Sequence, residues 1–183
     1  QYIFSQMAID AFIGRKDLLA LLNQQHGRSS GAFAVVYGRR RVGKTELIKQ
    51  FIRDKPAIFL TGKEAPRQIL IDDFLAQASL LHGRTLAGPG EVSSWRAALS
   101  LATAAWRSPQ RLVLVFDEIQ WAASDKASPE LIGTLQEFWD HEWQDNGRVL
   151  LIICSSFVGY TERLLGSKSP LFGRATARIL LRP

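Results

Sequence analysis

The chain has little cysteine and no long apolar run. Cys154 is the only cysteine among its 183 residues, so neither an internal disulfide nor a cysteine-rich metal cluster can form. The thiol lies beside the apolar residues 149–153, which predicts an inert place in the core. No apolar stretch reaches the roughly 20 residues needed to cross a bilayer, and the start of the chain lacks the basic-then-apolar order of a secretory signal. We therefore expect a cytoplasmic protein.

The composition argues against overall disorder and lacks a concentrated block of charge. Hydrophobic residues make up 46% and charged residues 22% of the chain, which is typical of a folded protein, and 183 residues suit one domain. The formal net charge of +6 would favour a polyanionic partner, but the lysines and arginines are scattered. Two interpretations stay open: a solvated surface with a nucleotide site, or a face that binds nucleic acid.

Short runs of branched apolar residues alternate with stretches of helical spacing. Such alternation predicts an α/β fold in which helices cover a mostly parallel sheet of five strands. The expected strands are 33–37, 57–61, 112–116, 149–154 and 178–181. The expected helices are 44–53, 69–81, 95–105 and 129–143, and residues 82–94 and 122–128 are expected to be loops.

A phosphate-binding loop connects the first expected strand to the helix that follows it. Residues 38–45 match the pattern G-x-x-x-x-G-K-[ST]. Glycines in such a loop let backbone N–H groups turn toward phosphate oxygens, and the start of the next helix adds a favourable dipole. Lys44 is expected to reach the β- and γ-phosphates, and Thr45 to supply a hydroxyl to Mg²⁺. The nucleotide-binding candidates are Gly38, Arg39, Arg40, Arg41, Val42, Gly43, Lys44, Thr45 and Glu46.

Two adjacent carboxylates follow the third expected strand. The apolar residues 112–116 lead directly into Asp117 and Glu118, at the carboxyl edge where ligands of open α/β sheets bind. A solvent-facing strand end is the alternative, but the loop that begins at Gly38 favours a functional pair. Asp117 is the candidate Mg²⁺ ligand, and Glu118 is the candidate base that polarises the attacking water. The sequence therefore predicts a site that binds ATP with Mg²⁺ and hydrolyses it to ADP.

Aromatic residues cluster in the expected helix 129–143. Phe138, Trp139 and Trp143 would form either a stacking surface for single-stranded nucleic acid or a part of the core. Their helical spacing favours the core or an interface. We interpret the remaining tryptophans in the same way: Trp95, Trp106 and Trp121.

Five segments together resemble the archaeal-type ATPase family, which belongs to the AAA+ and STAND-like P-loop ATPases and also occurs in bacteria. The similarity covers nearly the whole chain from Phe12 and implies a P-loop NTPase three-layer sandwich with an AAA+-like core. In chain order the segments are residues 12–15 (Phe-Ile-Gly-Arg), 37–45 (Tyr-Gly-Arg-Arg-Arg-Val-Gly-Lys-Thr), 116–121 (Phe-Asp-Glu-Ile-Gln-Trp), 153–156 (Ile-Cys-Ser-Ser) and 169–174 (Ser-Pro-Leu-Phe-Gly-Arg).

The resemblance also implies roles that the residue pattern alone does not provide. Ile13 and Gly14 would lie near the adenine. Ser156 would be a polar sensor between Glu118 and the γ-phosphate, with an ordinary strand-end serine as the alternative. Arg174 would be an arginine finger that acts in trans in a self-associated protein. A surface or interface salt bridge is the alternative for Arg174.

Two positions depart from the family pattern. Ser155 stands where a glycine usually precedes the sensor serine. The acid that often follows the opening Gly-Arg is displaced, and Asp17 is the nearest candidate. Neither departure touches the phosphate-binding loop.

The resemblance further sets expectations for domain organisation and function. We expect residues 1–11 to be an N-terminal extension, of which residues 1–6 are expected to be foreign to the natural chain because the first residue is Gln1 and Met7 is the only methionine. Residues 12–183 would form the ATPase core, and the family's C-terminal lid and effector domains would lie outside this chain. The core would couple ATP binding and hydrolysis to conformational change in those domains. A STAND-type regulatory switch with little turnover and a DNA-associated ATPase are the alternatives.

Overall fold

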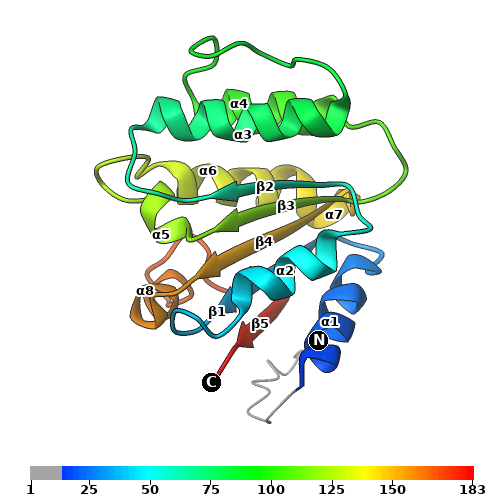
Figure 1. The fold of residues 1–183 in the computed structure, drawn as a ribbon, viewed down its shortest axis with the longest axis vertical. Coiled ribbons are helices and arrows are strands. Elements are labelled where there is room, and N and C mark those ends of the chain that lie inside the picture. Colours follow the sequence, from blue (N-terminus) through cyan, green and yellow to red (C-terminus); the bar gives the residue numbers. More distant parts are fainter. Residues whose placement is uncertain (1–13) are drawn as a thin grey trace.

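Five parallel strands form one sheet at the centre of the fold (Figure 1). The computed structural model describes residues 14–183, so Ile13 and the expected extension 1–11 lie outside the described residues. The strands pair in the order β2-β3-β4-β1-β5, and each of these pairings is parallel. The predicted α/β class and five-stranded sheet are confirmed. The strands are β1 (Ala32–Tyr37), β2 (Ala57–Thr61), β3 (Leu112–Asp117), β4 (Val149–Ser155) and β5 (Ala177–Leu180).

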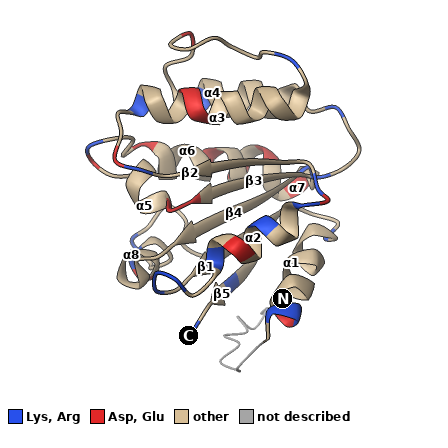
Figure 2. Cartoon of the chain, viewed as in Figure 1, with Lys and Arg blue, Asp and Glu red and all other residues tan. Residues whose placement is uncertain are grey.

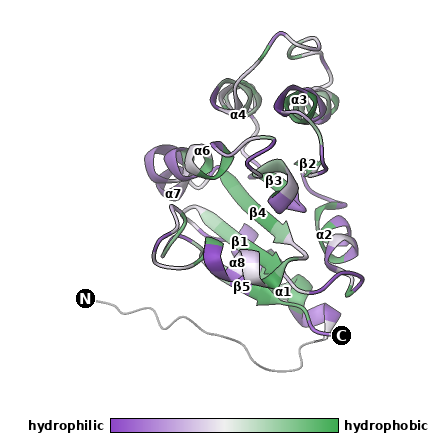
Figure 3. Cartoon of the chain, turned by 90° about the vertical axis from the view of Figure 1, so that its left-hand side faces the viewer, coloured by the Kyte–Doolittle hydropathy of each residue, from purple (hydrophilic) through white to green (hydrophobic). Residues whose placement is uncertain are grey.

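Helices cover both faces of the sheet, so the fold has three layers. One face is covered by α1 (Arg15–His26) and α2 (Lys44–Ile52). The other is covered by α3 (Arg67–His82), α4 (Trp95–Ala104), α6 (Leu131–Phe138) and η1 (Trp139–Trp143). Figure 3 shows the apolar strands with α1 and α2 on one side and α6 and α7 (Gln144–Asn146) on the other. Two further short helices, α5 (Ile119–Ala122) and α8 (Val158–Leu164), follow β3 and β4.

The alternation of side chains along the buried strands creates the two halves of the core. Along β1, Phe33 and Val35 face the layer of α3, α4 and α6, whereas Ala34 and Val36 face α1 and α2. Strands covered on both faces need apolar residues at every position, which is why they stand out in the sequence. Cys154 is buried in β4 as predicted, and burial raises the pKa of its thiol, so it stays protonated.

The helices depart from the predictions at several points. The predicted helix 129–143 begins at Leu131 and changes at Trp139 from α-helical to π-helical hydrogen bonding. In a π-helix the hydrogen bonds join residues five positions apart, so such residues lie on the same side of the helix. Phe138 and Trp143 are five apart, and the centroids of their rings are separated by 5.2 Å. No predicted helix corresponds to α1 or α8, and α5 extends into the predicted loop 122–128 only at Ala122. None of the helices in residues 14–183 has the length and apolar character that a bilayer span requires.

The predicted core position is confirmed for most of the aromatic residues in question. The buried ones are at most 6% exposed, which removes them from any surface that stacks on bases: Trp95, Phe138, Trp139 and Trp143. Trp106 and Trp121 are half-buried instead. The stacking-surface alternative for the predicted helix 129–143 is therefore wrong.

The topology brings three strand ends together at one edge of the sheet. β4 lies between β1 and β3, and it pairs Ser155 with Tyr37 and Ile153 with Phe116. The segments that follow β1, β3 and β4 therefore leave the sheet side by side, on the side to which the arrowheads point in Figure 1. These segments are the phosphate-binding loop, the acid pair and the region of Ser156. Ligands of open α/β sheets bind at this edge.

Candidate nucleotide-binding site

The loop between β1 and α2 makes tight turns directly before the helix. Gly38 and Gly43 have φ values of 154° and 91°, and Arg41 has a φ of 65°. Left-handed residues in such a loop let neighbouring backbone N–H groups converge on one point, and the helix that begins at Lys44 adds its dipole there. The loop therefore has the backbone form that phosphate binding requires.

Arg15, at the start of α1, packs on the loop at Gly43. A Cβ atom added at Gly43 would lie 2.6 Å from Arg15 Nη2, the end of an exposed side chain that can move, so the φ of 91° is what favours glycine at this position. The neighbouring Gly14 is exposed and does not line the pocket beside the loop. Ile13 lies outside the described residues. The expected place of Ile13 and Gly14 near the adenine thus stays a prediction.

A pocket of about 570 Å³ opens beside the loop. This volume is within the range of about 300–1,000 Å³ that small-molecule sites occupy. The lining combines cationic loop and helix residues with the acid-bearing segment. Gly38, Arg39 and Val42 shape the loop without lining the pocket. The lining residues are Arg40, Arg41, Gly43, Lys44, Thr45, Glu46, Lys49, Glu118 and Trp121.

Lys44 is held against its own loop. The residue is 4% exposed, and its Nζ donates a hydrogen bond of 2.6 Å to the carbonyl oxygen of Arg39. A buried ammonium group requires such an acceptor. A phosphate oxygen in the pocket is a stronger acceptor than a carbonyl oxygen, because both partners are then charged. Lys44 therefore lies where its ammonium group can donate a hydrogen bond to an anionic ligand in the pocket.

Thr45 and Asp117 join the loop to the acid-bearing strand. Thr45 Oγ1 donates a hydrogen bond of 2.8 Å to Asp117 Oδ2, across 72 residues of sequence. Asp117 is 2% exposed, and its Oδ1 accepts a hydrogen bond from the backbone N–H of Glu118. Mg²⁺ in nucleotide sites takes one or two protein oxygens and completes its coordination with phosphates and water. This oxygen pair fits such an ion, and residues 14–183 contain no larger cluster of His, Cys, Asp and Glu that could hold a metal.

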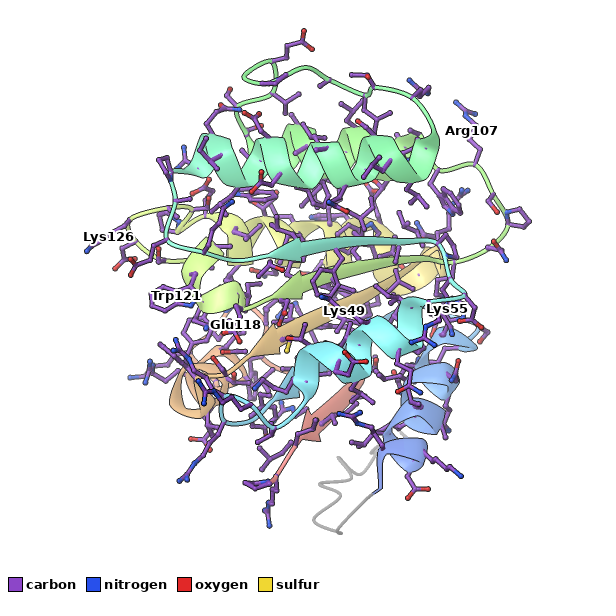
Figure 4. The ribbon with its side chains drawn as sticks, in the orientation of Figure 1. Lys49, Lys55, Arg107, Glu118, Trp121 and Lys126 are labelled. Carbon is purple, nitrogen blue, oxygen red and sulfur yellow. The ribbon has the colours of Figure 1, made fainter. Side chains whose placement is uncertain are left out.

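Glu118 lines the pocket from a left-handed backbone position, with φ 49° and ψ 46°. Its carboxylate accepts a hydrogen bond of 2.7 Å from Ser156 Oγ. Its backbone is in close contact with Gly62, where an added Cβ would lie 2.2 Å from the Glu118 carbonyl oxygen. Left-handed backbone is costly for a residue with a side chain and is concentrated at functional sites. Figure 4 shows Glu118 beside Trp121, at the end of β3.

Gln120 is a member of the site that sequence reasoning missed. Its buried amide donates a hydrogen bond to Glu118, accepts one of 2.9 Å from Ser155 Oγ and lies 3.5 Å from Ser156 Oγ. Ser155, which departs from the family pattern, thus makes a hydrogen bond that a glycine could not make. The signals in the sequence are that Gln120 follows Glu118 by two positions and lies in the segment 116–121 that carries the family resemblance, but neither gives it a role.

An aromatic pair lies at the rim of the pocket. The ring centroids of Trp121 and Phe157 are 5.6 Å apart in an edge-to-face arrangement. The guanidinium carbon of Arg40 lies 5.7 Å from the centroid of the Phe157 ring. The core interpretation does not hold for Trp121, since this half-buried indole lines the pocket.

Arg174 forms an ion pair within the chain. Its Nε and Nη2 donate hydrogen bonds of 2.8 and 2.9 Å to the two carboxylate oxygens of Asp140. These hydrogen bonds lower the pKa of Asp140 and raise the pKa of Arg174. The structure thus shows the salt-bridge alternative for Arg174. Its role as an arginine finger in trans stays a prediction.

Opposite charges meet at this edge of the sheet (Figure 2). The loop after β1 carries Arg39, Arg40 and Arg41, whereas Asp117 is the last residue of β3 and Glu118 follows it. A metal-bound triphosphate requires cationic groups for its phosphates and anionic groups for its metal. The arrangement fits such a ligand better than it fits a bare anion or a bare cation.

The chain matches the model of a protein family described as the ATPase domain predominantly from Archaea, over residues 12–183. It is also 25% identical, over 176 residues, to the uncharacterized protein MJECL04 of Methanocaldococcus jannaschii. The aligned region covers 94% of this chain and 36% of that protein. The chain therefore corresponds to only a part of this curated relative.

Solved structures of archaeal proteins share the fold. The Walker-type ATPase PABY2304 of Pyrococcus abyssi aligns with a TM-score of 0.71 at 19% identity, over 93% of this chain and 53% of that chain. The ORC2 protein of Aeropyrum pernix, in its ADPNP-ADP complexes, aligns with a TM-score of 0.63 at 16% identity, over 91% of this chain and 46% of that chain. The predicted P-loop ATPase fold is confirmed.

Proposed function

Since this chain belongs to the family of ATPase domains found predominantly in Archaea, we propose that its pocket binds ATP with Mg²⁺ and that Glu118 promotes hydrolysis of the γ-phosphate. The observation that carries this proposal is the hydrogen bond between Thr45 and Asp117. It joins the phosphate-binding loop to the acid pair, so that both halves of a hydrolytic site meet at one pocket.

The loop binds and orients the phosphates. Backbone N–H groups of the loop and of the first turn of α2 donate to the phosphate oxygens, and the helix dipole favours the negative charge. Lys44 exchanges its hydrogen bond to the Arg39 carbonyl for one to a phosphate oxygen. Arg40 and Arg41 line the same pocket and offset further negative charge.

Thr45 and Asp117 are the residues that would hold the Mg²⁺ ion that accompanies the nucleotide. When bound, the ion supplies positive charge that offsets the charge developing on the phosphates. The mutual hydrogen bond of Thr45 and Asp117 keeps their two oxygen atoms together, so both would be available to such an ion. Because Asp117 is buried and also accepts a hydrogen bond from the Glu118 backbone, its orientation is set before the ligand arrives.

Glu118 acts as the general base. The oxygen of a water molecule forms a new bond to the γ-phosphorus, while the bond from phosphorus to the bridging oxygen of ADP breaks. The Glu118 carboxylate takes the proton that the water loses. Ser156 donates to that carboxylate and so helps to orient it.

ATP binding is expected to change the fluorescence of Trp121. This indole is half-buried and lines the pocket with Thr45 and Glu118, so a bound nucleotide changes its surroundings. Three of the other four tryptophans are buried in the core, and Trp106 lies outside the pocket lining. Titration of the chain with ATP in the presence of Mg²⁺ should therefore give a saturable signal, from which a dissociation constant follows.

Two variants test whether the fluorescence change comes from Trp121 and whether ATP binding depends on Lys44. Trp121→Phe should abolish the fluorescence change while calorimetry still detects binding. Lys44→Ala should weaken ATP binding by roughly 10- to 150-fold, because it removes a charge-assisted hydrogen bond worth about 1.5–3 kcal/mol. An unchanged dissociation constant in Lys44→Ala, or the absence of calorimetric binding to the unmodified chain, would refute the proposal.

We also propose that the longer protein couples nucleotide binding to conformational change outside this chain. The proposal is supported by the coverage of the relatives: the chain spans 36% of the curated relative and 53% of the Pyrococcus abyssi ATPase, so those proteins have further segments on which such a change would act. Small-angle scattering and mass measurement of the full-length protein should show a change in radius or mass when ATP is added. A rise in mass would support self-association with Arg174 in trans. Identical radius and mass with and without ATP would contradict the coupling.

A further inference from the structure

Gln120 is a buried amide between the two strand ends that carry Glu118 and Ser155. It belongs to α5 and is 6% exposed. Its Nε2 donates a hydrogen bond to Glu118 Oε2, and its Oε1 accepts a hydrogen bond of 2.9 Å from Ser155 Oγ. One side chain therefore ties the Glu118 carboxylate to the end of β4.

Two donors hold the Glu118 carboxylate, and both act on the same oxygen. Ser156 Oγ donates to Oε2 at 2.7 Å, and Gln120 Nε2 donates to the same atom. This arrangement restricts rotation of the carboxylate and leaves Oε1 to accept a hydrogen bond from water. The base is thus oriented before a substrate arrives.

The cationic lining of the pocket makes this restraint necessary. Arg40, Arg41 and Lys44 line the same pocket as Glu118. An untethered carboxylate would pair with these groups, because opposite charges attract strongly in a partly buried pocket. A carboxylate drawn into such a pair would be turned away from the water molecule that it must orient. The Gln120 amide holds the carboxylate by donating a hydrogen bond to it, and because the amide is neutral it adds no charge.

Ser155 sets the orientation of the Gln120 amide. Ser155 Oγ donates to Gln120 Oε1 and accepts a hydrogen bond of 3.1 Å from the backbone N–H of Phe157. Ser155 and Gln120 are both buried. Because Oε1 is occupied by Ser155, Nε2 is directed at Glu118. Buried polar groups that are fully hydrogen-bonded hold a single arrangement.

We propose that Gln120 is a positioning residue for ATP hydrolysis, which holds the Glu118 carboxylate with Oε1 toward the attacking water. The inference rests on the proposed function of the site. Gln120 does not line the pocket, so it acts through Glu118 and not on the nucleotide. Its loss is therefore expected to change the rate of hydrolysis and not the affinity for ATP.

Gln120→Leu removes the donor and keeps a similar volume. The single-turnover rate of hydrolysis of Mg²⁺-ATP should fall by about 10- to 100-fold, the effect usual for residues that orient a reacting group. The calorimetric dissociation constant for ATP should stay unchanged. Gln25→Leu is the matched control, because Gln25 is also 6% exposed and is bonded through its Oε1 to Thr176 Oγ1. That variant should hydrolyse ATP at the unmodified rate.

A double variant separates positioning from a general structural effect. In a Glu118→Gln background, Gln120→Leu should slow hydrolysis no further, because the base that it orients is already absent. Equal slowing in both backgrounds would overturn the inference. So would an unmodified rate for Gln120→Leu.

Gln120→Glu provides a second route should the leucine variant not fold. It keeps the shape of the side chain but replaces the donor by a second carboxylate, so a comparable loss is expected and an unmodified rate would again overturn the inference. If the unmodified chain fails to hydrolyse ATP, the proposed function itself is wrong. If the unmodified chain hydrolyses ATP and the Gln120 variants match it, only the positioning role is wrong.

Discussion

Glu118→Gln is expected to slow ATP hydrolysis by about 10²- to 10⁴-fold and to leave ATP binding intact. The amide is nearly the same size as the carboxylate, but it cannot take a proton from water. The residues expected to hold the phosphates and the metal are untouched: Lys44, Thr45 and Asp117. Single-turnover release of phosphate measures the rate, and calorimetry measures the affinity.

A matched acid on the surface provides the control for this variant. Glu130 forms an exposed ion pair with Arg67 and does not line the pocket. Such surface pairs contribute at most about 1 kcal/mol to stability, so Glu130→Gln should leave both stability and hydrolysis close to their unmodified values. Equal rates for Glu118→Gln and Glu130→Gln would remove Glu118 from the role of general base.

Trp95→Ala is expected to destabilise the fold by about 3–5 kcal/mol, through loss of a large buried side chain and the cavity that remains. Trp95 is 1% exposed and packs against the rings of Phe74 and Phe116. Phe116 directly precedes Asp117, so this part of the core also supports the acid pair. Domains are typically stable by about 5–15 kcal/mol, and the variant would therefore lose a large share of the total. Urea unfolding measures the change.

One further variant isolates the contribution of a hydrogen bond to this effect, and a second provides a control tryptophan. Trp95 Nε1 donates a hydrogen bond of 2.7 Å to Ser128 Oγ, so Ser128→Ala leaves a buried donor unpaired at a cost of about 1–3 kcal/mol. Trp106 is half-buried, and Trp106→Ala should cost about 1 kcal/mol. A loss for Trp95→Ala no larger than that for Trp106→Ala would show that the core is not organised around Trp95.

The loop and the acid pair were predictable because each is a contiguous run with local causes. Residues 38–45 carry their chemistry in one pattern between a strand and a helix, and Asp117 ends a strand that is apolar at every earlier position. The sequence assigned Thr45 and Asp117 to the same metal ion, and the hydrogen bond between them agrees with the rule that parallel strands end at one edge.

The resemblance implied that Ser156 lies beside Glu118, and the structure places it there. The other side-chain contacts near the site were not predictable, because they depend on which segments lie next to one another. Gln120 bonds to Ser155 across 35 residues, and Arg174 bonds to Asp140 across 34 residues. The spacing of these residues along the chain shows no periodicity that would pair them. Strand order, with β4 next to β3, decides the first contact, and strand order is a tertiary property.

The helices were less predictable than the strands for a different reason. Helix α5 has 4 residues and helix α8 has 7, so neither completes the periodic pattern that marks a helix in sequence. Helix α1 is longer, but its buried apolar residues are only Leu18 and Leu22. The change to π-helical hydrogen bonding at Trp139 depends on the packing of large rings, which no residue pattern specifies.

The central claim is that the loop and the acid pair form one site that hydrolyses ATP. The most direct test is the release of γ-phosphate from radiolabelled ATP by the unmodified chain under single-turnover conditions, with Mg²⁺ and with a chelator. We predict release that requires Mg²⁺ and is lost with the chelator. Release should be slowed in Glu118→Gln, and in Lys44→Ala it should be reduced when protein and ATP are kept below the raised dissociation constant of that variant. Release that is the same in all of these samples, or is absent from the unmodified chain with ATP bound, would contradict the account.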